Sequence, residues 1–344
     1  MKIIIDAMGG DKAPGEIVKG ALRAWKELGV SLLLVGKKEE IAACLNEAGC
    51  EETKGELEIV DAREVVTMED DPSTATRRKK DSSMTVALNL LRDGKGDAVV
   101  SAGSTGALLT GATLIVKRIR GIRRAAMAPV LPAGEHGVML IDCGANVECT
   151  AEYLLQFACM GSFYAWKLMG CEEPRVGLLN VGTEDTKGGA LQHEAFALLR
   201  EAGEQGRIRF IGNVEGTDVF SGKADVVVTD GFTGNVLLKG TEGVIKYIMK
   251  SLKGVFYKSL KNKLAAAVLK NDLAEMKRSM DVNEVGGTAL IGIAKPVVKA
   301  HGSSDASSFF AAIRQAKAFS ESGIIDMIAD KVDLMKSENG HGQA

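Results

Sequence analysis

The sequence, 344 residues long, lacks the spacings that mark metal and redox sites. It has only four histidines, and its six cysteines include no C-x-x-C pair, which argues against a zinc site. We therefore predict no metal and no cofactor, and we interpret the cysteines as free thiols in a reducing compartment. The 43 lysines and arginines nearly balance the 45 acidic residues, so the overall charge gives no argument for a nucleic-acid partner.

Long apolar segments are absent as well. No uninterrupted apolar run reaches the roughly 18 residues that a membrane-spanning helix needs. The first residues enter an apolar run directly, without the charged region and cleavage site of a signal peptide. The sequence therefore predicts a soluble protein in the cytoplasm.

Short apolar runs alternate with helix-period stretches along most of the chain. The runs include KIIID, SLLLVG, DAVVSAG, GVMLIDCG, RVGLLNVG and ADVVVTDG, and the helix-period stretches lie at 14–29, 38–49, 84–93, 107–120, 151–170 and 189–203. Unbroken apolar strands that alternate with helices are typical of a mainly parallel sheet covered on both faces. The pattern predicts an α/β protein with a three-layer α/β/α fold and a mainly parallel mixed sheet.

The chain shows no Pro-rich or Ser-rich linker, so we predict one catalytic domain over residues 1–330. Within it, residues 244–263 hold six lysines and no acidic residue, and their apolar positions fall on another side of a helix. We predict a protruding helical segment at about 244–280. The polar end, residues 331–344, is typical of a disordered tail.

Gly-rich polar loops follow six of the strand-like runs. They are DAMGGD (6–11), SAGSTG (101–106), DCGAN (142–146), NVGTEDTKG (180–188), GNVEGTD (212–218) and DGFTGN (230–235). Ligands of open α/β sheets bind at the carboxyl ends of the strands. A single loop of this kind is most simply a tight connection, but six of them predict one shared cleft.

None of these loops carries a complete nucleotide-binding motif. The stretch MGGDKAPG lacks G-x-G-x-x-G, and Gly10 and Gly15 have the P-loop spacing without the Lys and Ser/Thr that should follow. AGSTG (102–106) resembles a nucleophile elbow centred on Ser104. In that hydrolase reading His301 is the base and Asp230 or Asp305 orients it.

The stretch HGSSDASS (301–308) precedes a helical pattern. A histidine, two hydroxyls and free backbone N–H groups at a helix start suit a phosphate or a developing oxyanion. An ordinary helix cap with a satisfied histidine explains the same residues.

Two basic segments suggest partners. The first is RRKKDSS (77–83), with Arg77, Arg78, Lys79 and Lys80 as candidate docking charges for an acidic partner. The second is the lysine-rich helix at 244–263, followed by LAAAVL (264–269), where Leu264, Val268 and Leu269 form a candidate membrane-inserting tip. A helix at a dimer interface is the alternative for this second segment.

Several of these motifs, in the same order, resemble the bacterial phosphate acyltransferase (PlsX) family. They are DAMGGD, RRKKDSSM, SAGSTGAL, NVGTEDTKG, GNVEG, DGFTGN and HGSS, and the resemblance runs from residue 1 to about residue 325. Two positions depart from the family pattern, which has Asn where Ser104 stands and Tyr where Val285 stands. Asn at the first position argues against a serine nucleophile, and the second departure puts any role of that tyrosine in doubt here.

The resemblance implies transfer of a fatty acyl group from acyl-carrier protein to inorganic phosphate, giving an acyl phosphate for phospholipid synthesis. It implies a fold like that of the isocitrate and isopropylmalate dehydrogenases, a homodimer, and peripheral association with the inner face of the cell membrane. The acyl-phosphate:glycerol-3-phosphate acyltransferase is then an expected partner. A dehydrogenase of the same fold, a Ser–His acyl hydrolase and a non-catalytic membrane scaffold are the alternatives.

For an acyl transfer to phosphate, the chain must bind phosphate, align it with a thioester and stabilise the oxyanion and the leaving thiolate. We predict that Lys187 binds phosphate, together with the backbone of Gly182, Gly188 and Gly189. His301 is the expected proton donor to the leaving sulfur. The expected supporting groups are Ser303 and Ser304 for the oxyanion, Asn146, Asn235 and Thr233 for the thioester, Gly9, Gly10 and Ser104 as further substrate contacts, and Asp6, Asp11 and Asp230 as acids that position cations and amides.

Overall fold

The computed structural model describes residues 1–279 and 286–336, and its strands form two sheets. The seven-stranded sheet has the order β3-β2-β1-β4-β12-β11-β5 and the five-stranded sheet the order β6-β7-β10-β8-β9. The first consists of β1 (Lys2–Asp6), β2 (Ser31–Gly36), β3 (Leu57–Asp61), β4 (Ala98–Ser101), β5 (Ala126–Ala128), β11 (Thr288–Ile291) and β12 (Val297–Lys299). The second consists of β6 (Val130–Leu131), β7 (Val138–Ile141), β8 (Arg175–Leu179), β9 (Arg209–Val214) and β10 (Val226–Val228).

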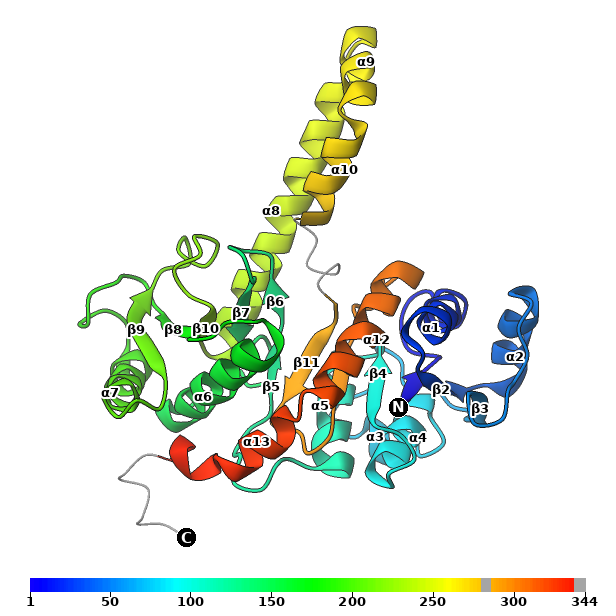
Figure 1. The fold of residues 1–344 in the computed structure, drawn as a ribbon, viewed down its shortest axis with the longest axis horizontal. Helices are drawn as coiled ribbons and strands as arrows, with labels where there is room; N and C mark the ends of the chain where they lie inside the picture. The colour runs from blue at the N-terminus through cyan, green and yellow to red at the C-terminus, as the bar shows by residue number, and fades with distance from the viewer. Residues whose placement is uncertain (280–285, 337–344) are drawn as a thin grey trace.

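Helices cover both faces of the sheets (Figure 1). They are α1 (Gly15–Leu28), α2 (Lys38–Glu47), α3 (Ala75–Arg78), α4 (Ser83–Arg92), α5 (Thr105–Gly111), the π-helix η1 (Ala112–Val116), α6 (Ala151–Leu168), α7 (Ala190–Glu204), α12 (Ala306–Glu321), α13 (Ile324–Asp330) and the 3-10 helix η2 (Val332–Met335). The strands are apolar on both sides because both faces are covered. In β1, Ile3 and Ile5 pack into one hydrophobic layer and Ile4 into the other, and all three are fully buried.

The predicted fold class is confirmed in its strand pattern, because parallel pairs join β1 to β2 and β4, β12 to β4, and β10 to β7 and β8. The division of the strands over two sheets was not predicted from the sequence. Pro129 separates β5 from β6, and its missing N–H cannot continue a ladder. Strands β11 and β12 were also missed, because runs of four and three residues are too short to show a period.

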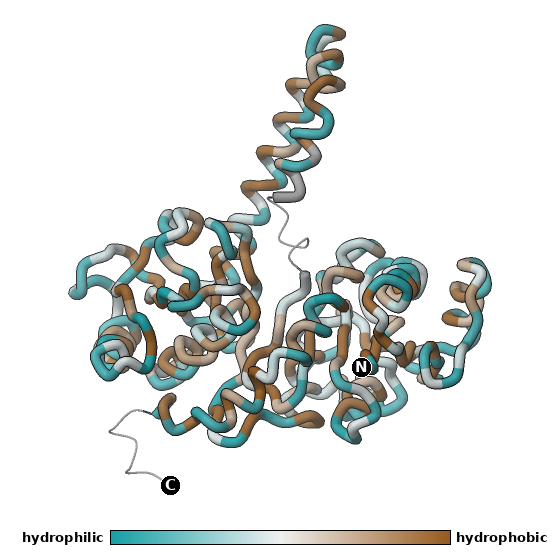
Figure 2. The backbone as a smooth tube through the Cα atoms, in the orientation of Figure 1, coloured by the Kyte–Doolittle hydropathy of each residue, from teal (hydrophilic) through white to brown (hydrophobic). Residues whose placement is uncertain are grey.

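A helical hairpin extends away from the sheets (Figure 1). It consists of α8 (Gly231–Tyr257), α9 (Leu260–Val268) and α10 (Lys270–Ser279). The carboxylate of Asp230 starts α8 by accepting a hydrogen bond from the Thr233 N–H at 2.8 Å. Apolar and polar segments alternate along the hairpin in Figure 2, and none of the α9 side chains is buried.

The described chain continues past α13 into part of the segment predicted to be a tail. Residues 332–335 form η2, and Met335 is buried. The Arg207 guanidinium donates to the carbonyls of Leu334 and Lys336 at 2.9 and 3.0 Å. Residues 337–344 lie outside the described residues, as does Val285.

Candidate functional site

A cavity of about 340 Å³ lies where the carboxyl ends of strands from both sheets meet. The loops after β4 and β12 form one side of it, and the loop after β7 with the first turns of α8 forms the other. We call this cavity the cleft. Its lining includes Thr105, Gly106, Met127, Pro129, Val130, Cys143, Gly144, Asn235, Leu238, Lys239, Glu242, Gly286, Gly287, Thr288, Lys299 and His301.

Three polar side chains stand at one level of neighbouring parallel strands. Ser101 of β4 is paired in register with Asp6 of β1 on one side and with Lys299 of β12 on the other. The Ser101 hydroxyl donates to Asp6 Oδ2 at 2.5 Å. All three residues are buried, so the carboxyl edge of the first sheet holds an acid, a hydroxyl and a cation in a row.

Lys299 is the buried cation of the cleft. Its ammonium donates to the carbonyls of Ala300 and, at 3.4 Å, Ala102. Burial lowers the pKa of Lys299 to about 8, while Asp6 and Asp11 oppose that shift. Lys299 is therefore charged at neutral pH and has donor capacity left for an anion in the cleft.

Asp6 is the acid behind Lys299. Burial raises its pKa, against the opposing influence of Ser101, Ser83, the Met8 N–H and Lys299. Its Oδ1 atom is buried and has no hydrogen-bond partner among the described residues. Asp6 is thus a buried acid whose charge is only partly compensated.

His301 follows β12 and is exposed at the cleft. Its Nδ1 accepts the Ser303 backbone N–H at 3.2 Å and lies 2.9 Å from the Ser303 hydroxyl. An accepting Nδ1 assigns the proton of the neutral ring to Nε2. Partial burial and the nearby Lys239 cation lower the pKa of His301.

Asn235 and Lys239 enter the cleft from α8. They stand one helical turn apart, so their side chains lie on one face of the helix. Lys239 is paired with Glu242 at 2.9 Å. The Asn235 amide makes no hydrogen bond to the rest of the described chain, so its donor and acceptor are free for a ligand.

Asp142, at the end of β7, organises the opposite side of the cleft. Its carboxylate accepts the backbone N–H groups of Met127 (2.8 Å), Ala145 (3.3 Å) and Asn146 (2.6 Å), and the Asn146 side chain at 3.0 Å. Burial raises the pKa of Asp142 to about 6 in spite of these donors. The Asn146 amide also donates to the Ala125 carbonyl at 2.8 Å, so Asn146 holds loops together and does not line the cleft.

Gly9 and Gly10 allow close packing of three strand-end loops. A Cβ on Gly9 would stand 2.6 Å from Asp6 Oδ2, and Gly10 has a φ of +104°. The next residue, Asp11, donates its N–H to the Gly302 carbonyl at 2.8 Å. These glycines bring the first loop against the His301 loop.

The loop after β8 holds the predicted phosphate-binding residues Gly182, Lys187, Gly188 and Gly189. Lys187 is half exposed and lies 3.8 Å from Glu184, and Gly189 begins α7. None of the four is among the residues that line the cleft within the described part of the chain. Their predicted role stays a prediction.

The predicted Ser–His hydrolase arrangement does not assemble. Ser104 is buried at the start of α5, whereas the His301 ring is hydrogen-bonded to Ser303. The candidate orienting acids are used as caps, because Asp230 accepts from Thr233 and Asp305 from Ser308. Ser304 is buried behind the cleft.

The predicted docking cations differ in freedom. Lys79 is tied down at 2.6 Å to Asp70 and at 2.9 Å to the Val65 carbonyl. Arg77, Arg78 and Lys80 are exposed. At the far end of the hairpin, Leu264 is 63% and Val268 83% exposed, and Leu269 is exposed as well, so the predicted tip is an apolar surface.

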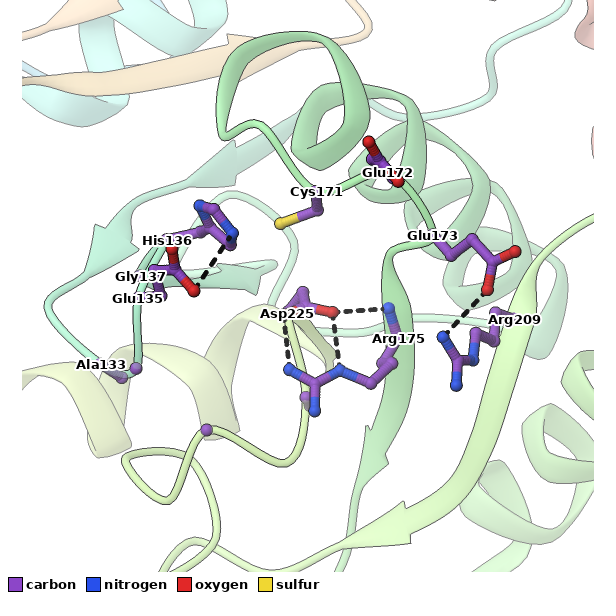
Figure 3. Close-up of a pocket in the computed structure, with 13 residues that line it drawn as sticks. Ala133, Glu135, His136, Gly137, Cys171, Glu172, Glu173, Arg175, Arg209 and Asp225 are labelled. Atoms are coloured by element: carbon purple, nitrogen blue, oxygen red, sulfur yellow. Dashed lines mark hydrogen bonds and ion pairs between the residues drawn. The ribbon is translucent and has the colours of Figure 1, made fainter.

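A second polar cavity, of about 420 Å³, lies at the amino-terminal ends of β7, β8 and β10 (Figure 3). The Arg175 guanidinium makes a bidentate pair with Asp225 there, at 2.8 and 2.9 Å, and Arg209 pairs with Glu173. Its strongest charges are already paired with one another. It also lies at the opposite edge of the sheet from the carboxyl ends, where ligands of open α/β sheets bind.

Lys299, Ser101 and Lys239 were not predicted as site residues from the sequence. A signal was present for the first, since VVKAH ends an apolar run with a lysine just before His301. Lysine is rarely buried unless it has a partner or a function, so a lysine at the end of a buried strand is a candidate site residue. The sequence gives no sign that Lys239 belongs to the site. It differs from the lysines farther along α8 only in lying near the start of the helix, which is at the cleft.

No helix of the described chain is both long enough and apolar enough to cross a bilayer. Over the same residues, no three metal-binding side chains gather at one point.

Comparison with known proteins agrees with this geometry. A family described as "Fatty acid synthesis protein" matches residues 1–327. The chain belongs to this family. It is 46% identical to a phosphate acyltransferase of Oceanobacillus iheyensis, covering 97% of this chain and 98% of that protein. It is 47% identical to a phosphate acyltransferase of a Geobacillus species, covering 97% and 99%.

Two solved structures share the fold at low identity. A phosphotransacetylase from Streptococcus pyogenes superposes with a TM-score of 0.64 at 18% identity, covering 93% of this chain and 94% of that one. A putative 4-hydroxythreonine-4-phosphate dehydrogenase from Salmonella typhimurium gives 0.52 at 12% identity, covering 92% and 99%. The predicted family resemblance and the dehydrogenase-like fold are both confirmed.

Proposed function

We propose that this member of the family transfers a fatty acyl group from the thioester of an acyl-carrier protein to inorganic phosphate, giving acyl phosphate and a free thiol. One observation carries the proposal. The cleft combines a buried lysine, a histidine with an Nε2 proton and a free amide, at the strand ends where this fold binds ligands. The phosphate acyltransferases that the chain matches over nearly its full length support this reading.

The reaction needs no group on the protein as nucleophile. A phosphate oxygen attacks the thioester carbon, the O–C bond forms, and the C–S bond breaks as the tetrahedral oxyanion collapses. In this scheme Lys299 and Lys239 bind the phosphate and offset its negative charge. Without these cations, the phosphate and the developing oxyanion would repel each other. Asn235 donates to the acyl oxygen.

His301 supplies the proton that the leaving sulfur needs. Its lowered pKa keeps the ring neutral at neutral pH, with the proton on Nε2. The two proton transfers occur together: the Nε2 proton passes to the sulfur as the C–S bond breaks, and the proton of the attacking hydrogen phosphate passes to Nε2, so the ring stays neutral and the net change is one proton moved from phosphate to thiol. Ser303 fixes the ring through Nδ1 throughout.

The loop from 182 to 189 completes the proposal. Lys187 and the glycines beside it act as a second phosphate-recognition group on the five-stranded sheet, where Asn180 holds the loop by donating to the Lys187 carbonyl at 3.0 Å. Thr233 and Ser104 shape helix starts beside the substrate. No metal or cofactor takes part in this scheme.

We also propose that the chain works as a homodimer at the cytoplasmic face of the membrane, next to the acyltransferase that consumes its product. The exposed Leu264, Val268 and Leu269 at the hairpin end would enter the bilayer, and the nearby lysines would meet anionic headgroups. Leu264→Glu with Leu269→Glu should abolish sedimentation with anionic vesicles. Full sedimentation of that variant would contradict the membrane role.

Hydroxylamine trapping tests the proposed activity. Purified protein is incubated with long-chain acyl-carrier protein with and without phosphate, the acyl hydroxamate is measured, and the released thiol is titrated. We expect phosphate-dependent hydroxamate, and a severe loss of rate in His301→Ala and in Lys187→Ala. Absence of phosphate-dependent hydroxamate would overturn the activity, and near-normal rates in both variants would overturn the site.

A further inference from the structure

A third hollow, of about 380 Å³, is lined in part by chain segments that also line the cleft. Its lining includes Leu109, Thr110 and Thr113 from α5 and η1, Ala125 before β5, and Asn146 after β7. The three chain segments that form the hollow are the same three that form part of the cleft wall, where they contribute Gly106, Met127 and Gly144. We call this hollow the side groove.

The cleft and the side groove follow one another along each of these segments. Gly106 and Thr110 of α5 are four residues apart and so lie on one face of that helix, and Thr113 follows in η1. On the strand, Met127 and Ala125 are alternate residues, and both belong to the same hydrophobic layer. Neighbouring residues of the same three segments therefore line the groove and the cleft.

The outer end of the side groove is strongly basic. Residues 117–124, KRIRGIRR, contain five cations and no acid. Arg118 and Arg124 line the groove, and Lys117, Arg120 and Arg123 are exposed beside it. None of the five has a carboxylate within 4 Å among the described residues, although Glu148 also lines the groove. Glu152 interacts with Arg123 and the Tyr153 ring lies under Arg124, so the segment keeps a net positive charge that is only partly compensated.

We propose that Lys117–Arg124 is the docking surface for the acidic acyl-carrier protein, and that the side groove admits the arm that carries its thioester. This inference rests on the proposed function, because it says from where the acyl donor enters. The hydroxyls of Thr110 and Thr113 and the amide oxygen of Asn146, whose N–H₂ is already used by Ala125 and Asp142, suit the amides and hydroxyl of a phosphopantetheine arm. An alkyl chain fits the apolar part of the cleft better, beside Met127, Val130 and Leu238.

The other basic segments fit this partner less well. Lys79 is already paired with Asp70, and Arg77, Arg78 and Lys80 line neither cavity. The hairpin lysines stand beside exposed apolar side chains such as Val244 and Leu260, a combination that suits a membrane surface. In 117–124 the apolar side chains of Ile119 and Ile122 are buried, so this segment exposes charged side chains and no large apolar ones.

The charge-reversal pair Arg120→Glu, Arg123→Glu tests the docking surface. Both arginines are exposed and neither lines the cleft or the groove. We expect the KM for acyl-carrier protein to rise about tenfold or more, with a much smaller change in kcat, and the salt dependence of kcat/KM to become weaker. The matched control is Lys26→Glu, Lys54→Glu, which reverses two exposed cations elsewhere and should leave KM within about twofold of wild type.

The outcomes separate the two proposals. If wild type makes no phosphate-dependent hydroxamate, the proposed function fails. If wild type is active and the reversal pair keeps a normal KM while Arg77→Glu, Arg78→Glu raises it, the docking surface is wrong. Loss of binding to anionic vesicles with a normal KM would make 117–124 a membrane surface and would also overturn the inference.

A folding defect is distinguished by a milder variant. Arg120→Gln, Arg123→Gln removes the charge without adding acid and should raise KM by a smaller factor in the same direction. Thr113→Trp fills the groove and should lower kcat/KM for the carrier-protein donor while thermal unfolding stays cooperative. A normal kcat/KM in both of these variants would contradict the proposal.

Discussion

Each of the two sheets ends at the cleft in a buried aspartate, and the two aspartates differ in their partners. Asp142 accepts four hydrogen bonds from Met127, Ala145 and Asn146. Asp6 accepts a 2.5 Å hydrogen bond from Ser101, with a weaker influence from Ser83 and the Met8 N–H, and its Oδ1 atom is buried without a partner. The hydrogen bonds of the Asp142 carboxylate hold a loop in place. The Asp6 carboxylate has fewer hydrogen bonds and interacts electrostatically with the neighbouring Lys299.

The two buried aspartates therefore have different roles: Asp142 fixes a loop, and Asp6 acts on a neighbouring cation. A buried charge is costly unless hydrogen bonds or an opposite charge compensate it. On the five-stranded sheet the hydrogen bonds of Asp142 fix the loop that carries Gly144 into the cleft. On the seven-stranded sheet the compensation is left incomplete, and Lys299 stays available for an anion.

The largest expected effect is on Lys299. Lys299→Met removes the buried cation of the first sheet, and we expect kcat/KM for phosphate to fall about 10³-fold, as for loss of a preorganised oxyanion donor. The free energy of unfolding should change little, because the substitution removes the desolvation cost of Lys299 but also removes the cation that partly compensates Asp6. Hydroxamate rates and urea unfolding measure the two effects. Loss of stability without loss of rate would make Lys299 a structural residue.

A loss of stability is expected for Asp142→Asn. Its amide N–H₂ would face the N–H donors of Asn146, at a cost of about 2 to 3 kcal/mol in the free energy of unfolding. Because folding raises the pKa of Asp142 from 3.8 to about 6, the folded protein holds that proton more tightly. This contribution to stability is complete below the lower pKa and is lost as the pH rises through the higher one.

Urea unfolding of wild type and Asp142→Asn across pH 4 to pH 7 measures this. The variant should lack the part of the pH slope that Asp142 gives to wild type. An unchanged free energy of unfolding would mean that the loop does not depend on this carboxylate.

The smallest effect belongs to Asp6→Asn. Burial disfavours the charge of Asp6, and one of its oxygens has no partner. The free energy of unfolding should therefore change by less than about 1 kcal/mol. Lys299 loses a negative neighbour, so its pKa should fall below about 8. The alkaline limb of kcat/KM for phosphate, set by loss of the Lys299 proton as the pH rises, should then move to lower pH.

The matched control for that limb is Lys299→Arg. Arginine stays charged over the whole range, so the limb near pH 8 should disappear in this variant even if the rate is lower. A limb that stays in place in both Asp6→Asn and Lys299→Arg would show that Lys299 is not the group that titrates.

The sequence predicted much of this edge but not how its parts meet. Strand-like runs and Gly-rich loops indicated a cleft at the strand ends, and His301, Asn235 and Gly144 do lie there. The row of Asp6, Ser101 and Lys299 depends on the register of three strands that are far apart in sequence, and β12 has only three residues. A buried strand of three residues is too short to show a hydrophobic period, so neither β12 nor Lys299 at its end was predicted.

The placement of Asn146 and Lys187 shows a different limit. Both follow strands in loops of the expected type, yet Asn146 is used by Asp142 and Ala125, and Lys187 is separated from the cleft wall. β8 is two strands away from β7 in the sheet order, and that order is a tertiary property. Residue type and loop position indicate a candidate, whereas sheet order decides which candidates share a cavity.

The most direct test of the account is thiol release without phosphate. Direct attack by phosphate predicts that acyl-carrier protein mixed with the enzyme alone releases no thiol, and that added phosphate yields one acyl phosphate for each thiol released. A rapid burst of one thiol per chain in the absence of phosphate would show a covalent acyl-enzyme and would contradict the mechanism.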